Sequence, residues 1–435
     1  MENIFVTNEE HEEIARAVLV SVFPKGEDPE EHEASLDELE RLLETAGGES
    51  FARLVQNKEH PDNATYIGSG KIEELKTLCH TGGCELVIFD AELSPSQIRN
   101  IENELARDSE GAITVIDRSM LILDIFALHA VTGEGKAQVE LAQIKYTAPR
   151  LIGKGKQLSR LGGGIGTRGP GETKLEQDRR HLARRAAALE RDIAEMARTR
   201  EVQRKQRDNT GMTKIAIAGY TNAGKSTLLN RLTGAGILAE DKLFATLDPT
   251  TRKFSLPSGN EILLTDTVGF IRNLPHHLIK AFKSTLDEVK YADAIVVMID
   301  ASDAQSASQL EVTENLLSEL DAGDKPIIYV LNKCDRLEGG VVFPPNVLGG
   351  GKNIAMISAL TGDGIESLIE KLEQIASMGK RRVELLIPNS KLSMIDIVYK
   401  NGSDIQIDYT PEGAKISVVL DTASIGRLSQ FKVGE

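Results

Sequence analysis

A motif at residues 219–227 constrains this chain more than any other stretch: Gly219-Tyr220-Thr221-Asn222-Ala223-Gly224-Lys225-Ser226-Thr227. It has the spacing GxxxxGK[ST], follows the apolar run 215–218 and precedes the helical pattern 228–232. This strand, loop and helix context is the one in which such a motif holds phosphate, because glycines let backbone N–H groups approach phosphate oxygens and the helix start presents further N–H groups. The sequence therefore predicts a nucleotide site here.

Three later motifs predict which nucleotide it is. The apolar run 261–265 ends in Asp266-Thr267-Val268-Gly269, the run 327–331 ends in Asn332-Lys333-Cys334-Asp335, and the run 354–357 ends in Ser358-Ala359. The Asp335 carboxylate can accept from the ring N–H and the exocyclic amine of guanine, a pair that adenine lacks, and a backbone N–H of the last motif can approach guanine O6. The ordered set predicts a GTP site.

The stretch from Leu243 to Arg252 resembles switch I of translation-factor-related small GTPases. That resemblance implies that Lys225 neutralises the β- and γ-phosphates, Ser226 coordinates Mg²⁺ and Thr227 supports the α-phosphate. Thr246 is the expected second magnesium hydroxyl, with Thr250 and Thr251 as rivals. The Asp266 carboxylate can hold the magnesium shell, through water, and the Gly269 N–H can reach the γ-phosphate. We expect Lys225, Thr246 and Gly269 to be catalytic. Further nucleotide contacts are expected from Phe244, Ala245, Leu247, Asp248, Thr267, Val268, Cys334 and Leu360.

Two positions in the motifs affect mechanism. Ras-like GTPases place a glutamine directly after DxxG to orient the attacking water, and this chain has Phe270 there. A phenyl ring cannot hydrogen-bond water, so unaided hydrolysis should be slow and a partner should complete the site. Asn222 resembles an asparagine with which some related GTPases bind K⁺, and a loop-stabilising amide is an equally good interpretation.

Charge is unevenly distributed along the chain. Residues 1–50 carry 15 acidic and 3 basic side chains, a net charge of −12, whereas residues 136–208 carry 18 basic and 9 acidic side chains, a net charge of +9. No apolar run is long enough to span a membrane, and the N-terminus lacks the pattern of a signal peptide. Cys79, Cys84 and Cys334 lack the spacing of a disulfide framework or zinc finger, which favours reduced thiols in a cytoplasmic protein.

The basic excess surrounds a glycine-rich stretch at residues 153–171. A long helix is expected from Glu172 to about Arg207, with a coiled-coil seam at Leu182, Ala186, Leu189, Ile193 and Met196. Its partner is expected to be the preceding helix around 139–146, in an antiparallel hairpin with the glycines at its tip. Basic side chains among exposed backbone N–H groups suit RNA, and the alternatives are a flexible hinge and a solvated helix face. The expected RNA-binding residues are Lys154, Lys156, Arg160, Arg168, Arg179 and Arg180.

The chain is long enough for several domains, and we expect a multidomain α/β protein. Residues 1–135 alternate apolar runs with helical patterns, which predicts a small parallel α/β domain. Residues 136–211 form the basic helical hairpin, 212–379 a Ras-like P-loop domain, and 380–435 a small α+β domain with an antiparallel hairpin around Pro411-Glu412-Gly413.

Several stretches resemble the HflX family of GTPases: 162–176 with Asp178-Arg179-Arg180, 66–71, 219–226, 244–251 and 269–276. Family membership implies a cytoplasmic GTPase that binds the large ribosomal subunit and splits or rescues stalled or idle ribosomes, particularly under stress, with the ribosome as activator. Some members also hydrolyse ATP, on which only the turn at 68–71 bears here. We expect a monomer. A weak membrane association is also expected. The rival interpretation is a GTP-dependent signalling or scaffold switch that recruits a protein at a membrane surface, with the coiled coil as a dimer seam and without RNA binding.

Overall fold

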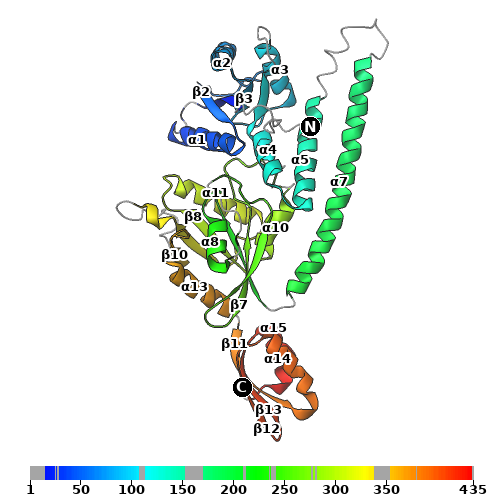
Figure 1. Cartoon of the computed structure of the whole chain (residues 1–435), viewed down its shortest axis with the longest axis vertical. Helices are drawn as coiled ribbons and strands as arrows, with labels where there is room; N and C mark the ends of the chain where they lie inside the picture. Colours follow the sequence, from blue (N-terminus) through cyan, green and yellow to red (C-terminus); the bar gives the residue numbers. More distant parts are fainter. Residues whose placement is uncertain are drawn as a thin grey trace. The chain divides into compact units, whose positions relative to one another are not determined.

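A computed structural model describes residues 15–24, 26, 29–106, 113–151, 170–208, 212–234, 236, 242–275, 278–279, 282–337, 353–378 and 380–433 (Figure 1). The chain forms two compact units. Unit 1 runs to Met196 and also includes Glu240–Asp248 and Arg272–Lys283. Unit 2 comprises Ala197–Ala239, Pro249–Ile271 and Ser284–Glu435. Two short segments from within the predicted P-loop domain therefore pack with the N-terminal unit.

The N-terminal sheet is parallel, as the alternation of apolar runs and helical patterns predicts. Its strands β1 (Arg16–Phe23), β2 (Glu49–Asn57), β3 (Leu86–Phe89) and β4 (Thr114–Asp117) lie in the order β2-β1-β3-β4. Helices α1 (Pro29–Thr45), α2 (Ser69–Gly82) and α3 (Pro95–Leu105) connect successive strands. The start of α3 is fixed by a capping box, in which the Ser94 side chain accepts from Gln97 N and the Gln97 side chain accepts from Ser94 N.

The turn at 68–71 makes polar contacts with neighbouring residues of the protein. Gly68 N donates to Gln56 Oε1 at 2.9 Å, and Lys71 pairs with Glu74 at 2.7 Å. These contacts fit a tight turn at the start of α2.

Two helices follow β4: α4 (Arg118–His129) and α5 (Gly133–Leu151). The break has a local cause. Ala130 adopts an extended conformation after α4, and the Thr132 side-chain oxygen accepts from Gly135 N at 3.0 Å, which caps the start of α5. Sequence periodicity alone did not show this cap.

Helix α7 (Pro170–Asp208) begins two residues earlier than expected, on a proline that the first helical turn tolerates. Helices α5 and α7 lie side by side and run in opposite directions (Figure 1). Ala137 and Ile144 of α5 are buried with Leu189 of α7, and the other predicted seam residues pack around them. Arg185 forms a bidentate ion pair with Glu140, with both N–O distances at 2.6 Å. The predicted antiparallel helical pair is confirmed over these residues.

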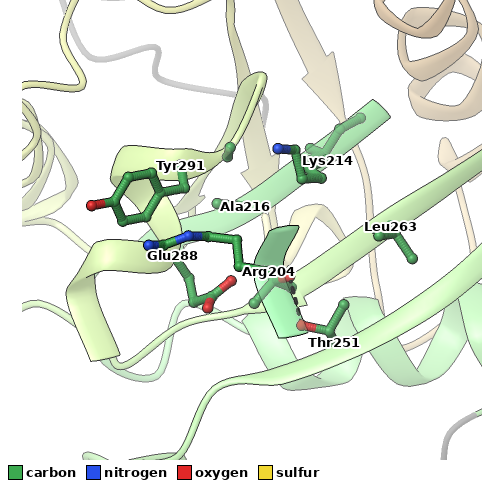
Figure 2. Close-up of a pocket in the computed structure, with 10 residues that line it drawn as sticks. Arg204, Lys214, Ala216, Thr251, Leu263, Glu288 and Tyr291 are labelled. Atoms are coloured by element: carbon green, nitrogen blue, oxygen red, sulfur yellow. Dashed lines mark hydrogen bonds between the residues drawn. The ribbon is translucent and has the colours of Figure 1, made fainter. Parts of the chain in front are cut away.

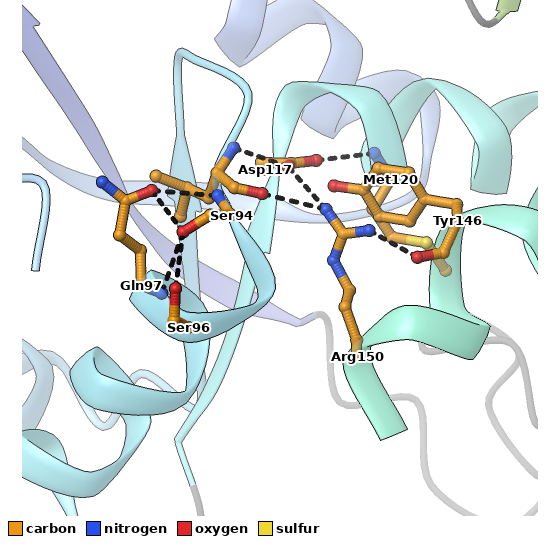
Figure 3. A network of polar contacts seen from close by, with 8 residues as sticks. Ser94, Ser96, Gln97, Asp117, Met120, Tyr146 and Arg150 are labelled. Atoms are coloured by element: carbon orange, nitrogen blue, oxygen red, sulfur yellow. Dashed lines mark hydrogen bonds and ion pairs between the residues drawn. The ribbon is translucent and has the colours of Figure 1, made fainter. Parts of the chain in front are cut away.

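A buried polar network holds the far end of α5 (Figure 3). The Asp117 carboxylate is fully buried and accepts from Leu93 N and Met120 N at 3.0 Å each. Arg150 lies over the Tyr146 ring, with its guanidinium carbon 3.2 Å from the ring centroid, and it also donates to Leu93 O at 3.1 Å. This network joins α5 to the starts of α3 and α4.

Unit 2 contains a mixed sheet with the order β10-β9-β8-β5-β7-β6, in which β6 alone of these strands is antiparallel to its neighbour. The strands are β5 (Thr213–Gly219), β6 (Thr250–Ser255), β7 (Glu261–Asp266), β8 (Ala294–Asp300), β9 (Ile327–Asn332) and β10 (Asn353–Met356). The helices are α8 (Lys225–Thr233), α10 (Lys283–Tyr291), α11 (Ser306–Glu319) and α13 (Ile365–Ser377). Because β5, β7, β9 and β10 share a direction, their carboxyl ends meet at one edge, where the four motifs lie.

The last turns of α7 contact this sheet domain within unit 2 (Figure 2). The Arg204 guanidinium lies over the Tyr291 ring, with its central carbon 3.6 Å from the ring centroid. Both side chains line a small pocket together with Lys214, Thr251 and Glu288.

The C-terminal residues form an antiparallel sheet with the order β11-β13-β12, in which β12 and β13 are the predicted hairpin. Its elements are β11 (Lys380–Pro388), α14 (Ile395–Asn401), β12 (Ser403–Thr410), β13 (Gly413–Asp421) and α15 (Thr422–Arg427). The three cysteines are free thiols, and burial raises the pKa of Cys79 to about 12. Across the described ranges, no helix combines the length and the apolar character needed to cross a bilayer.

Candidate nucleotide site

The phosphate loop joins β5 to α8 through backbone conformations that its sequence suits. Gly219 and Gly224 have φ values of +144° and +93°, in the region that favours glycine. Asn222 has φ +59°, and asparagine is one of the few other residues that adopt this conformation readily. That preference explains the asparagine without any bound ion. A Cβ at position 224 would clash with Asn332 Nδ2, so this glycine also permits close approach of the NKxD strand.

Lys225 lies inside the loop. Its side chain is buried, and Nζ donates to Tyr220 O at 2.7 Å and to Gly219 O at 3.3 Å. Its pKa is lowered to about 8, mainly by burial; the nearby Asp266 carboxylate opposes this shift, and Lys333 adds to it. The ammonium is thus held where a phosphate anion would favour its charged form.

Ser226 and Asp266 bring a hydroxyl and a carboxylate together. Ser226 Oγ donates to Asp266 Oδ2 at 2.6 Å, and the aspartate is fully buried at the carboxyl end of β7. Hydroxyl and carboxylate oxygens are the ligands that Mg²⁺ prefers. These two residues therefore fit the magnesium ion that the family resemblance implies.

The DxxG motif lies directly beside the phosphate loop. A Cβ at position 269 would be 2.6 Å from Thr221 Cα and 3.0 Å from Lys225 Nζ, so only glycine fits there. Thr267 Oγ1 donates to Ile217 O at 2.8 Å and joins β7 to β5, and Val268 is buried next to it in sequence.

Phe270 has no side-chain polar group to offer the site. Its ring is 1% exposed, and its backbone N donates to Gly219 O at 3.1 Å while its carbonyl accepts from Thr221 N at 2.8 Å. The residue after DxxG is therefore fixed in the core and paired with the phosphate loop.

Asn332 connects three motifs. Its Nδ2 donates to Ala223 O at 2.8 Å, and its Oδ1 accepts from Ala359 N at 2.9 Å. The NKxD motif predicts Asn332 as a nucleotide contact but gives no sign of this structural role, because its partners lie 109 and 27 positions away in the sequence.

The expected base-recognition residues surround this centre. Lys333 has φ +62° and pairs with Asp300 at 2.7 Å, while the Asp335 side chain is exposed at the start of a short 3₁₀ turn. Cys334 N donates to Ile357 O at 3.2 Å, Ser358 is buried, and Leu360 is 65% exposed. Arg231 of α8 donates to the carbonyls of Ala359 and Leu360, a contact with no sequence signal because its position in the helix pattern is ordinary.

The switch-like segment 243–248 belongs to unit 1. Leu243, Phe244 and Leu247 are buried, and Ala245 and Thr246 are half-buried. Asp248 directs its carboxylate at the start of α5, where it accepts from Val131 N at 2.9 Å and Thr132 N at 2.8 Å. The rival hydroxyls, Thr250 and Thr251, lie on β6 in unit 2, and Thr251 Oγ1 is 2.9 Å from Thr265 Oγ1.

The expected RNA-binding residues divide into two groups. Lys154, Lys156, Arg160 and Arg168 lie outside the described residues. Arg179 and Arg180 are exposed on α7, and Arg180 forms an ion pair with Glu176 on its own helix, with Nε 3.3 Å from the carboxylate oxygen.

Comparisons with known proteins cover most of the chain. Residues 33–127 match the family model described as GTP-binding GTPase N-terminal, residues 129–207 match GTP-binding GTPase Middle Region, and residues 214–333 match 50S ribosome-binding GTPase.

Curated relatives extend the similarity to nearly full length. The chain is 48% identical over 420 residues to GTPase HflX of Lacrimispora saccharolytica, with 97% of each chain covered. It is 46% identical over 416 residues to GTPase HflX of Caldanaerobacter subterraneus, covering 96% of this chain and 93% of that one, and 41% identical over 363 residues to GTPase HflX of Escherichia coli, covering 82% of each. A solved GTP-binding protein from Sulfolobus solfataricus in complex with GDP is 26% identical, with a TM-score of 0.44, and covers 84% of this chain and 99% of that one.

Proposed function

The chain belongs to the HflX family of GTPases, and on that premise we propose that it binds the large ribosomal subunit and uses GTP binding and hydrolysis to split or rescue stalled or idle ribosomes. In this proposal the basic helical pair α5–α7 contacts ribosomal RNA, and the ribosome stimulates hydrolysis.

The nucleotide site supplies the chemistry. Lys225 neutralises the β- and γ-phosphates, and Asp335 selects guanine. Bound Mg²⁺ would offset negative charge on the phosphates, held by Ser226 and Thr246 and, through water, by Asp266. In this proposal the Gly269 N–H reaches the γ-phosphate, which the direct contact between the phosphate loop and DxxG supports.

One observation carries the need for an external activator. The Phe270 ring is buried, and both of its backbone polar groups are paired with the phosphate loop. Position 270 therefore cannot orient the attacking water, although Ras-like GTPases use it for that purpose. A second macromolecule that positions the water would make hydrolysis conditional on docking.

The surface of α7 favours RNA as that macromolecule. Arg179, Arg180 and Arg184 are exposed along the half of the helix that follows the glycine-rich stretch. Arg185, in contrast, is paired with Glu140 of α5. Exposed arginines on a helix that follows a basic stretch of sequence suit phosphate groups, which are the dominant contacts in RNA recognition.

Sedimentation with ribosomes in a nonhydrolysable GTP analogue tests the proposal. We expect Arg179→Gln/Arg180→Gln to reduce co-sedimentation and to flatten its salt dependence, since each lost phosphate contact lowers the salt slope. The matched control is Arg191→Gln/Arg198→Gln, which removes the same charge from exposed positions on the same helix, with Arg198 about 28 Å from Arg179 along the axis. Equal binding of the two variants would refute the RNA contact.

The rival is a switch that recruits a protein without RNA. Under that interpretation ribosomes neither co-sediment with the chain nor raise its GTP turnover. A light-scattering assay of subunit separation then distinguishes mere binding from splitting.

The same preparation tests the ions. Removal of Mg²⁺ with a chelator should weaken GTP binding, because the site at Ser226 and Asp266 then lacks the cation that offsets the negative charge of the phosphates. Equal turnover in K⁺ and Na⁺ buffers would leave Asn222 with only its role in the loop conformation.

A further inference from the structure

The segment 243–248 makes specific contacts with the N-terminal helices. Leu243 N donates to Thr45 Oγ1 of α1 at 3.3 Å, and the Phe244 ring packs edge to face on Phe126 of α4 with centroids 4.8 Å apart. The other short segment of unit 1, 272–283, reaches the same ring. Phe282 packs against Phe126 with centroids 4.6 Å apart. One aromatic side chain of α4 therefore contacts both segments that continue into the nucleotide domain.

A second contact lies at the start of α5. The Asp248 carboxylate accepts from Val131 N, Thr132 N and Thr132 Oγ1, and it lies at the helix end where the dipole favours negative charge. A Cβ at position 135 would be 2.5 Å from Asp248 Oδ1, so Gly135 is needed for this approach. We call this contact between Thr132, Gly135 and the Asp248 carboxylate the joint.

The joint is close in sequence to the proposed magnesium ligand. Only Leu247 separates Asp248 from Thr246, a span of about 7 Å along the chain. Leu247 is itself buried, and this restricts how far Thr246 and Asp248 can move relative to one another. A shift of the backbone at Thr246 would therefore alter the geometry at Asp248.

We propose that Asp248 is a positioning residue that couples the nucleotide state to the α5–α7 helical pair through the start of α5. The coupling passes from Asp248 to α5 and then to α7 through the packing of Ala137 and Ile144 against Leu189. It rests on the proposed nucleotide site and does not depend on what α7 binds.

Coupling of this kind is reciprocal. If replacing GDP by a GTP analogue changes the stability of the joint by some factor, then abolishing the joint must change the ratio of the GDP and GTP-analogue affinities by that same factor. Coupling factors in proteins are typically about 5- to 150-fold.

Two variants weaken the joint from opposite sides. Asp248→Ala removes the carboxylate. Gly135→Ala pushes the carboxylate away while leaving every nucleotide motif intact, and it favours helix, so α5 should remain folded. The matched control is Gly133→Ala in the same turn, where an added Cβ meets no atom of the described structure within 4 Å.

Hydrogen exchange and nucleotide titration of the full chain test the proposal together. In the wild type, we expect exchange at the amides of residues 131–135 to differ at least fivefold between GDP and the GTP analogue. In Gly135→Ala and Asp248→Ala this difference should disappear, and the affinity ratio should change by a matching factor, whereas Gly133→Ala should behave as wild type.

Three results would overturn the inference. One is equal exchange in the two nucleotide states of a wild-type protein that binds both, and another is an affinity ratio in Gly135→Ala equal to that of Gly133→Ala. Either result removes the coupling and leaves the nucleotide site standing. Failure of the wild type to bind guanine nucleotide would remove both.

Discussion

Replacing Asn332 with alanine tests the centre of the nucleotide site. The substitution deletes the 2.8 Å bond from Nδ2 to Ala223 O and the 2.9 Å bond from Ala359 N to Oδ1. Ala223 and Ala359 are 1% and 2% exposed, so water cannot readily replace either partner. The phosphate loop and the base-side loop would lose the side chain that holds them together.

The expected cost follows from the two orphaned groups. A buried donor or acceptor left without a partner costs about 1–3 kcal/mol. Removal of the amide opens space beside Gly224, into which the loops can relax and lower the cost. We therefore take about 2–4 kcal/mol for the two groups together. To the extent that nucleotide binding requires both loops in place, GDP affinity should fall by roughly 30- to 1,000-fold.

Titration with a fluorescent GDP analogue measures this loss, and thermal unfolding without nucleotide measures the part that is already lost in the free protein. Asn332→Asp keeps the acceptor for Ala359 N but places a carboxylate opposite the Ala223 carbonyl, so it should bind no better than Asn332→Ala. Asn389→Ala is the control, because the exposed Asn389 also donates to a carbonyl, that of Pro411, at 3.1 Å. If Asn332→Ala bound GDP within threefold of wild type, the bridging role of this amide would be refuted.

Two further predictions concern Lys225 and Phe270. The pKa of Lys225 is about 8 in the free protein, and phosphate should raise it, so nucleotide binding takes up a proton above pH 8. Affinity should be greatest below pH 8 and fall by up to about tenfold per pH unit above it; calorimetry in buffers of different ionisation enthalpy counts the protons, and zero uptake at pH 8.5 would contradict the assignment. Phe270→Gln should not restore rapid unaided hydrolysis, because the side chain at this position points into the core, and it should cost about 3 kcal/mol of stability. Single-turnover GTP hydrolysis and urea unfolding report the two effects, and a tenfold rise in the unstimulated rate would show that the side chain reaches the water.

Much of the fold was predictable because its determinants are local. Ser94-Pro95 marks the start of α3 through a cap that lies within four residues, and the apolar runs of β1 to β4 are long enough to identify buried parallel strands. The four nucleotide motifs were likewise readable, since each follows a strand and parallel strands bring their carboxyl ends together. The division between α4 and α5 has no clear sequence signal, because Thr132 and Gly135 do not interrupt the apolar periodicity.

The sequence by itself determined which loops carry glycine, carboxylate or amide groups after each strand. It therefore determined that a guanine nucleotide site would form at one sheet edge. Only the tertiary structure decided what those groups contact. Asn332 reaches Ala223 across 109 positions, and Asp248 reaches Thr132 across 116. Contacts over such separations depend on how whole elements pack, and packing energy is shared among many buried side chains, so no short pattern records it.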